Sequence, residues 1–262
     1  MNESKSRTST MIFRDKLWEH IIKHNNIDIK NGSIITSSHI KNSQKSWKGK
    51  KNQFEPRILC KIDKYQKLPL IFKEKNLCLL SVKNGEYMLV DNIYFELNNN
   101  TKPVILEKGD YSEHNCLLLN IGDSETTMLD NLLLNGTLSK IIGEKVKYGP
   151  LLGGRHRAHF DTIIGDKSIT INGSQYETDG CYETDNYICI VEAKSCACDN
   201  FNIRQLYYPY REVHKVVKDK KQIICLFIYK DKSRNIHIHK FMWNDYKKML
   251  DIININYYQI LF

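Results

Sequence analysis

The segment Gln175–Lys194 reads QYETDGCYETDNYICIVEAK, with an acidic residue at Asp179 and the run Glu192-Ala193-Lys194 at its end. Tyr187–Val191 is rich in β-branched and aromatic residues, which is typical of a buried strand. Asp185-Asn186 is a turn dipeptide, because short polar side chains tolerate the backbone angles of a turn. The segment therefore predicts a β-hairpin.

A two-residue loop fixes which residues of this hairpin face each other. It sets Asp179 opposite Glu192 and Glu177 opposite Lys194. Opposed side chains lie about 5 Å apart at Cβ, close enough for two carboxylates to share one divalent ion. Glu192 and Lys194 share one face of their strand, and Ala193 points to the other. A slip of one residue would undo this arrangement, so the register tests the hypothesis.

These residue types suit hydrolysis of a phosphodiester. Mg²⁺ prefers oxygen ligands, neutralises phosphate charge and lowers the pKa of a bound water. We expect Asp179, Glu192 and the Ala193 carbonyl to bind the metal. Lys194 would hold or help deprotonate the attacking water and stabilise charge on the phosphate. The alternative is that Glu192 and Lys194 are solvent-facing residues of a half-exposed strand.

The C-terminal part of the chain resembles the PD-(D/E)xK nuclease superfamily, and within it the type II restriction endonucleases. The resemblance runs from about Tyr148 to the C-terminus, and Thr178 stands where the superfamily motif has proline. It implies a mixed β-sheet flanked by helices, Mg²⁺ as cofactor with Mn²⁺ as a substitute, and double-stranded DNA as substrate. It also implies that Asp179 and Glu192 bind metal and that Lys194 is the catalytic lysine. The motifs that carry it are GPLLGGRHRAHFD (149–161), QYETDG (175–180), IVEAK (190–194) and FNIRQLYYPYR (201–211).

Three further residues are candidates for an extended site. Glu144 lies in Leu138–Val146, which we predict to be a helix, and the superfamily often supplies an acidic residue from such a helix; the alternative is a solvated or ion-paired glutamate. Gln205 lies on the helix expected at Phe201–Val217, where the RecB-like nucleases carry Gln-x-x-x-Tyr; here Pro209 stands at the position of the Tyr and Tyr210 follows it. Glu177 shares the predicted face of Asp179, and its alternative role is to pair with the lysine opposite it.

Positive charge is concentrated at the start of the 262-residue chain. Residues 1–70 contain 15 Lys and Arg against 6 Asp and Glu, whereas residues 71–262 contain 24 of each kind. A basic module beside a neutral module with a carboxylate site suggests that the first binds DNA and the second cuts it. We therefore predict a DNA-binding domain at residues 1–125 and a nuclease domain at residues 126–262.

The first module has the pattern of an α+β winged helix-turn-helix-like domain. Phe13–His24 has the apolar spacing of an amphipathic helix, and Ile35–Ile40 begins a second helix with Thr36 or Ser37 as its N-cap. Asn84-Gly85 between two strand-like segments marks a hairpin. Residues with amide or cationic side chains are candidate DNA contacts: Lys41, Asn42, Gln44, Lys45, Lys48, Arg57 and Arg155. The alternatives are a solvated loop for the lysine-rich segment and a structural ion pair with a site carboxylate for Arg155.

The remaining sequence completes the expected α/β fold. Gln222–Tyr229 and Ile236–Phe241 are predicted strands, and Asn244–Ile253 is predicted to be a closing helix. No apolar run reaches about 18 residues, and the first ten residues lack the apolar core of a secretory signal. We expect a cytoplasmic protein without membrane association.

These patterns predict a Mg²⁺-dependent type II restriction endonuclease. A homodimer would place one site on each strand of a palindrome, and a cognate DNA methyltransferase would protect the host. The first alternative is a DNA repair or recombination nuclease of the same superfamily, which would prefer structures or ends to a sequence. The second is a non-catalytic winged-helix DNA-binding protein, which would bind DNA without cutting it.

Overall fold

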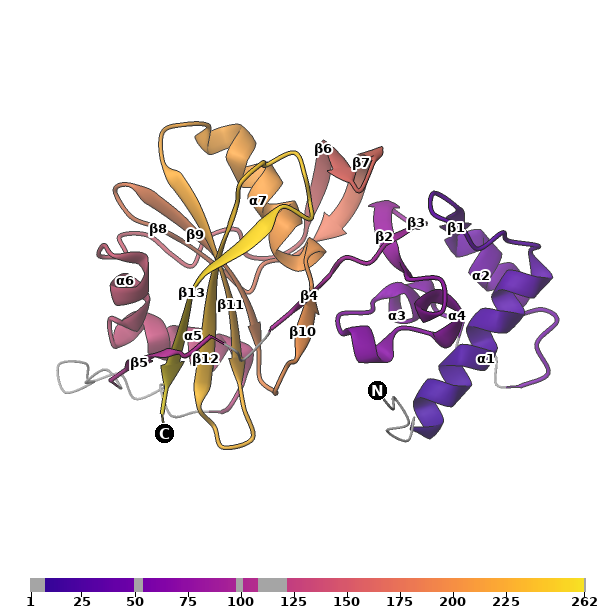
Figure 1. The fold of residues 1–262 in the computed structure, drawn as a ribbon, viewed down its shortest axis with the longest axis horizontal. Helices are drawn as coiled ribbons and strands as arrows, with labels where there is room; N and C mark the ends of the chain where they lie inside the picture. Colours follow the sequence, from indigo (N-terminus) through magenta and orange to yellow (C-terminus); the bar gives the residue numbers. More distant parts are fainter. Residues whose placement is uncertain (1–7, 50–53, 98–100, 108–121, 262) are drawn as a thin grey trace.

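The computed structural model describes residues 8–49, 54–97, 101–107 and 122–261. It is a mixed α/β structure of helices and sheets, in which an N-terminal body lies beside a larger C-terminal body (Figure 1). The helices of the described residues are α1 (Ser9–His24), α2 (Ser37–Ser43), α3 (Pro56–Cys60), α4 (Leu70–Lys73), α5 (Glu125–Leu134), α6 (Thr137–Ile142), α7 (Arg204–Val217) and the 3-10 helix η2 (Tyr65–Lys67). The strands are β1 (Ile34–Thr36), β2 (Leu77–Lys83), β3 (Glu86–Asp91), β4 (Tyr94–Glu96), β5 (Val104–Leu106), β6 (His156–Ile164), β7 (Lys167–Tyr176), β8 (Gly180–Glu183), β9 (Tyr187–Lys194), β10 (Asn200–Asn202), β11 (Gln222–Lys230), β12 (Ile236–Trp243) and β13 (Ile252–Ile260).

The N-terminal body places helices before a hairpin, in the order that the sequence predicts. α1 buries Leu17 and Trp18 on its apolar face. Thr36 caps α2, because its hydroxyl accepts from the His39 N–H at 3.1 Å while the His39 ring accepts from the Thr36 N–H. β2 and β3 pair antiparallel, and Gly85 in their turn has a φ of +76°. The predicted first helix, the cap and the hairpin are confirmed.

Two larger sheets organise the molecule. The six-stranded sheet has the order β5-β13-β12-β11-β9-β8 and is mixed, since β9 runs parallel to β11 and β5 parallel to β13. The five-stranded sheet has the order β1-β3-β2-β7-β6 and spans both bodies, because Lys83 of β2 pairs with Asn172 of β7. β4 and β10 form a separate two-stranded ladder.

The β8–β9 hairpin has the predicted register. Gly180 lies opposite Val191, and Glu183 lies opposite Ile188. The Thr184 N–H donates to the Tyr187 carbonyl at 2.9 Å, which closes the two-residue loop at 185–186. One further step along this register brings Asp179, the residue before β8, level with Glu192.

Several predicted boundaries are wrong. The strand expected from Gln175 onward is interrupted, because β7 ends at Tyr176 and β8 begins only at Gly180. The helix expected at Leu138–Val146 ends at Ile142, where Gly143 takes a left-handed φ of +96°.

The C-terminal segment is also different from its prediction. Asn244–Ile253 does not form a closing helix; it contains a turn and leads into β13. Ile and Asn alternate at residues 253–256, which is the period of a strand, and β13 pairs with β12 on one side and with β5 on the other. The next helix, α7, begins at Arg204 because residues 200–202 pair with β4 as β10.

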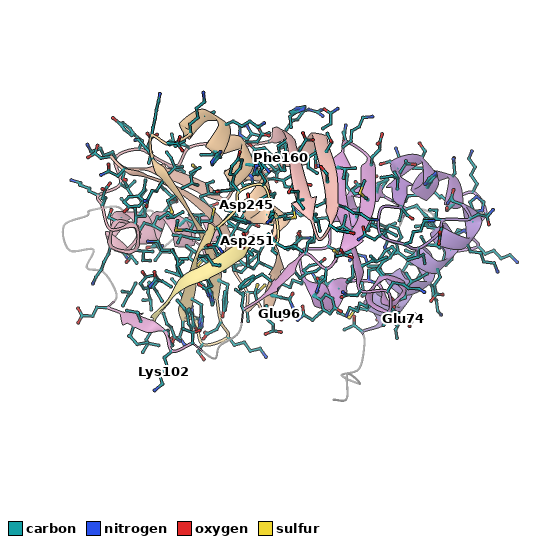
Figure 2. The ribbon with its side chains drawn as sticks, turned by 45° about the horizontal axis from the view of Figure 1, so that its top comes forward. Glu74, Glu96, Lys102, Phe160, Asp245 and Asp251 are labelled. Carbon is teal, nitrogen blue, oxygen red and sulfur yellow. The ribbon has the colours of Figure 1, made fainter. Side chains whose placement is uncertain are left out.

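The six-stranded sheet separates two apolar clusters. On one face, α5 and α6 pack against Val191 and Ala193 of β9. On the other face, α7 packs over Ile188 and Ile190, which belong to the cluster that extends into the N-terminal body. Phe160 of β6 points toward α7 in this second cluster (Figure 2). Residue alternation along β9 therefore puts Glu192 on the α7 face.

Phe201 of β10 joins the small ladder to the large sheet. Its ring stacks on Phe227 with 4.4 Å between centroids and lies 5.4 Å from the ring of Phe241. Its side chain is 1 % exposed. Aromatic rings at these separations add to the free energy of burial.

We predict that Phe201→Ala lowers the free energy of unfolding by about 3–5 kcal/mol, because the cavity left behind cannot collapse fully. Urea titration followed by far-UV circular dichroism measures the loss. Phe201→Leu is the control and should cost less, since it keeps most of the apolar volume. A loss for Phe201→Ala within about 0.5 kcal/mol, as at a surface position, would contradict this packing.

Candidate active site

Asp179, Glu192 and Lys194 come together at the open end of the β8–β9 hairpin. Oδ2 of Asp179 accepts from the Ala193 N–H at 2.7 Å and lies 3.8 Å from Nζ of Lys194. The Lys194 ammonium also donates to the Glu192 carboxylate and, at 2.9 Å, to the Ala193 carbonyl. Hairpin register and strand alternation together thus collect two carboxylates, one carbonyl and one ammonium.

Glu192 is the most enclosed member of this cluster. It is 6 % exposed, so the alternative of a solvent-facing glutamate is wrong. Burial raises the pKa of Glu192 to about 8, although attraction by Lys194 opposes the increase. Burial also raises the pKa of Asp179, against the hydrogen bond from Ala193. The site therefore favours added positive charge, because both carboxylates are poorly solvated.

Lys194 is partly buried beside these acids. Burial is the largest single effect and would lower the pKa of Lys194, but the attraction and hydrogen bond of Glu192, together with the charges of Asp179 and Glu125, hold this pKa above its ordinary value. The side chain consequently carries its proton at neutral pH. It can act as a cation and hydrogen-bond donor toward a bound anion.

Gln205 approaches the cluster from the first turn of α7. Its Nε2 donates to the Glu192 carboxylate. Its Oε1 is buried and has no hydrogen-bond partner among the described residues. A buried acceptor without a partner is rare, and Gln205 is one of the residues that line the cavity.

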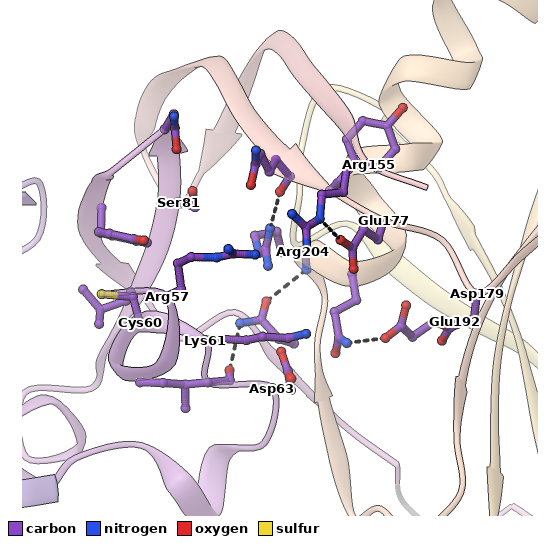
Figure 3. A pocket seen from close by; sticks show the side chains of 18 of the residues that line it. Arg57, Cys60, Lys61, Asp63, Ser81, Arg155, Glu177, Asp179, Glu192 and Arg204 are labelled. Carbon is purple, nitrogen blue, oxygen red and sulfur yellow. Dashed lines mark hydrogen bonds and ion pairs between the residues drawn. The ribbon is translucent and has the colours of Figure 1, made fainter. Parts of the chain in front are cut away.

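A cavity of about 500 Å³ opens over the cluster (Figure 3). Its walls come from both bodies: Arg57 and Lys61 project from the N-terminal side toward Asp179 and Glu192. Acidic side chains of the lining are Asp63, Glu125, Glu177, Asp179 and Glu192. Cationic side chains of the lining are Arg57, Lys61, Arg155, Lys194 and Arg204. The carboxylate cluster thus lies in a cleft that also offers several cations to an anionic ligand.

Sequence analysis missed two acidic residues of this lining. Glu125 is the first residue of α5, and its carboxylate accepts from the Ser195 N–H at 3.1 Å. Asp63 follows α3, and its charge adds to the increase in the pKa of Glu192 after burial and Asp179. Ser124 followed by an apolar run could have predicted where α5 begins. No sequence spacing, however, indicates that Glu125 or Asp63 lies near the hairpin.

The other predicted acidic residues have structural partners. Glu144 lies at the far end of the hairpin, where its carboxylate accepts from the Thr184 hydroxyl at 2.7 Å and from the Asn186 N–H at 3.1 Å. Its proposed place in the site is therefore wrong; it fixes the 185–186 loop. Glu177 pairs with Arg155 at 2.8 Å, and its expected pairing with Lys194 is not formed because β7 ends before it.

The candidate DNA contacts fall into two groups. Arg57 and Arg155 line the cavity. The others lie on or just after α2 in the N-terminal body and do not line it. Four of these are exposed, and Gln44 is half-buried: Lys41, Asn42, Gln44, Lys45 and Lys48.

The residues available to a divalent cation are the carboxylates of Asp179 and Glu192 and the carbonyl of Ala193. Within the described part of the chain, no three His, Cys, Asp or Glu side chains meet with metal-ligand spacing. A cation here would therefore complete its coordination with water or with a ligand oxygen. This suits Mg²⁺, which keeps several waters when bound.

Comparison with protein-family models identifies the domain families of the chain. A model described as Domain of unknown function (DUF6997) matches residues 90–259, and the chain belongs to this family. A second model, Domain of unknown function (DUF6996), matches residues 15–89. Neither curated proteins nor solved structures gave a match. The two models meet between residues 89 and 90, and our division at residue 125 stays a prediction.

No helix among the described residues is both long enough and apolar enough to cross a membrane.

We predict that Mg²⁺ affinity rises with pH. Metal ligands must be deprotonated, and protons compete for Glu192 below its raised pKa of about 8. The dissociation constant, measured by isothermal titration calorimetry, should fall by about tenfold per pH unit below that pKa and then level off.

Glu192→Gln should weaken binding and flatten this pH dependence. Glu144→Gln is the matched control, since its carboxylate lies at the other end of the hairpin, and it should behave as the parent protein does. Equal, pH-independent affinity in all three proteins would show that Mg²⁺ does not bind at this cluster.

Proposed function

We propose that this protein is a Mg²⁺-dependent endonuclease that hydrolyses phosphodiester bonds of double-stranded DNA. The observation that carries the proposal is the convergence of Asp179, Glu192 and Lys194 at one end of a hairpin, inside a cleft lined with cations. Two carboxylates can hold a metal ion and one lysine can stabilise charge on the phosphate, which suits metal-assisted phosphodiester hydrolysis.

Three features of the cluster support a bound Mg²⁺. Its ligands would be oxygen atoms of Asp179, Glu192 and Ala193, the type that this ion prefers. Burial, and then the charge of Asp179, raises the pKa of Glu192, and a divalent cation beside it would stabilise the ionised carboxylate. When bound, Mg²⁺ would lower the pKa of a coordinated water and neutralise part of the phosphate charge. Mn²⁺ should substitute for it.

The side chains have separate tasks in this reaction. Lys194 is protonated next to Glu192, so we assign it to charge stabilisation on the phosphate rather than to removal of the water's proton. The free Oε1 of Gln205 would accept a hydrogen bond from the attacking water. Water adds to phosphorus as the bond to the 3′ oxygen breaks; the attacking water gives one proton to the solvent, and the leaving 3′ oxygen takes one from the solvent. The products are a 3′ hydroxyl and a 5′ phosphate.

DNA is the favoured substrate because of where positive charge lies. The surplus of Lys and Arg falls within residues 1–70, most of which form the N-terminal body. The order α1-β1-α2-α3-α4-β2-β3, with β1 beside β3, is compatible with a winged-helix module. Such a module selects a sequence through its side chains.

This combination makes a type II restriction endonuclease the preferred form of the proposal. It would act as a homodimer on a palindrome, with a DNA methyltransferase as its partner in the same cytoplasmic system. A repair or recombination nuclease of the PD-(D/E)xK type would use the same chemistry on structures or ends.

We predict that the protein cuts unmethylated phage-type DNA into discrete fragments with Mg²⁺ and not with EDTA. Asp179→Asn and Lys194→Ala should each lower the rate at least about 100-fold, because each removes a charge that the reaction needs. Gel electrophoresis of timed digests measures the rates, with Glu144→Gln as the control that keeps activity.

Other results would change the assignment. A Mg²⁺-dependent smear, or trimming from ends, would favour a repair nuclease. A gel shift without cleavage on several DNAs would favour a non-catalytic DNA-binding protein. Equal cleavage by Asp179→Asn and the parent protein would place the chemistry elsewhere.

A further inference from the structure

A short segment of the N-terminal body, residues 61–66, is fixed onto the C-terminal body; we call it the strap. The carbonyl of Ile62 accepts from the Tyr94 hydroxyl at 2.6 Å and from Nδ2 of Asn202 at 3.4 Å. Ile62 is 4 % exposed, so its side chain is buried at this junction. Because this main-chain carbonyl accepts two hydrogen bonds from the C-terminal body, the backbone at Ile62 is fixed to that body.

The rest of the strap is held in the same way. Nζ of Lys64 donates to the Ala197 carbonyl at 2.9 Å and to Sγ of Cys196 at 3.2 Å. The Tyr65 N–H donates to Oδ1 of Asn200 at 2.9 Å. These contacts reach the loop that follows Lys194 and the strand β10. The strap is therefore positioned by the same elements that surround the carboxylate cluster.

This anchoring directs two charged side chains into the cleft. Lys61 has extended backbone angles, φ −82° and ψ 95°, and in an extended segment the neighbours of a buried residue point away from it. Lys61 and Asp63 accordingly line the cavity with Asp179 and Glu192, and Figure 3 shows the Lys61 ammonium between the two walls.

Lys61 is exposed, and among the described residues no close ion pair joins its ammonium to a carboxylate. Its charge nevertheless acts on Asp179: burial raises the pKa of that carboxyl, and Lys61 is one of the groups that oppose the increase. Its neighbours in the cleft include Arg57 on the same wall and Arg204 on the opposite wall. An exposed cation without a close ion pair, beside a carboxylate cluster that we propose binds a metal ion, is suited to an anion that bridges the two.

We infer that Lys61, delivered by the strap, binds the phosphodiester at the carboxylate cluster. The active cleft would then be built from both halves of the chain, and the N-terminal body would contribute to turnover as well as to DNA affinity. The inference rests on the proposed nuclease function for its substrate. It differs from the contacts expected of the α2 lysines, which do not line the cleft.

The test compares the full-length parent protein with Lys61→Ala, Lys61→Arg and Lys67→Ala. Lys67 is the matched control, because it is an exposed lysine six residues further along the chain, at the end of η2, that does not line the cavity. Two quantities are measured for each: the single-turnover cleavage rate with Mg²⁺, and the affinity for a labelled duplex with Ca²⁺ at two salt concentrations.

Loss of one charge-assisted contact to phosphate should slow cleavage by Lys61→Ala about 10- to 100-fold. The slope of the logarithm of DNA affinity against the logarithm of salt concentration should also become shallower for Lys61→Ala, because binding releases about one counterion fewer. Lys61→Arg should restore most of the rate, and Lys67→Ala should match the parent. Unchanged thermal unfolding of all variants would confirm that the effect is not structural.

The outcomes separate this inference from the proposed function. Cleavage by the parent with an equal rate for Lys61→Ala would overturn the role of Lys61 and leave the nuclease proposal intact. If the parent binds DNA and does not cleave it, the nuclease proposal fails, and the salt dependence alone decides Lys61. An unchanged salt slope for Lys61→Ala in that case would overturn the inference too.

Discussion

The enclosed carboxylate of Glu192 is the feature around which this cleft is built. An ionised carboxylate loses solvation when it is buried, and it is tolerated only with hydrogen bonds and opposite charge around it. Lys194 supplies the charge, and Gln205 supplies a hydrogen bond from α7. The β8–β9 register then brings the Asp179 carboxylate to the same place, which adds a second negative charge to the cluster. One ammonium among these acids leaves the cluster short of positive charge, and the proposed metal would supply the remainder.

The two halves of the chain meet at this same point. β2 and β7 join them in one sheet, and the strap lies across β10 and the loop after Lys194. A nuclease domain that only carried a separate DNA-binding domain would need no such contact. The arrangement instead makes a cleft whose acidic floor belongs mainly to one half and whose cations come from both. This is the physical reason to treat the two matched domain models as one working unit.

The hairpin could be predicted because its determinants are local. A polar dipeptide between β-forming residues sets the loop, and the loop sets the register of Asp179 and Glu192. Glu125 and Asp63 could not be found in the same way, since only tertiary folding brings α5 and the strap to the cleft. Glu144 was assigned to the site on helix position alone, and it proved to stabilise the far loop. The helix predicted at Asn244–Ile253 was wrong, and the last strand was not predicted, because the Ile and Asn alternation of residues 253–256 was given too little weight.

The most direct measurement of the central claim is sequencing of the fragment ends after complete digestion of an unmethylated genome, with Asp179→Asn as the background. The account predicts ends that carry 5′ phosphates, share one short sequence and depend on Mg²⁺. Ends scattered without a common sequence would contradict site-specific cleavage. Ends that are equally frequent with Asp179→Asn would contradict hydrolysis at this cluster.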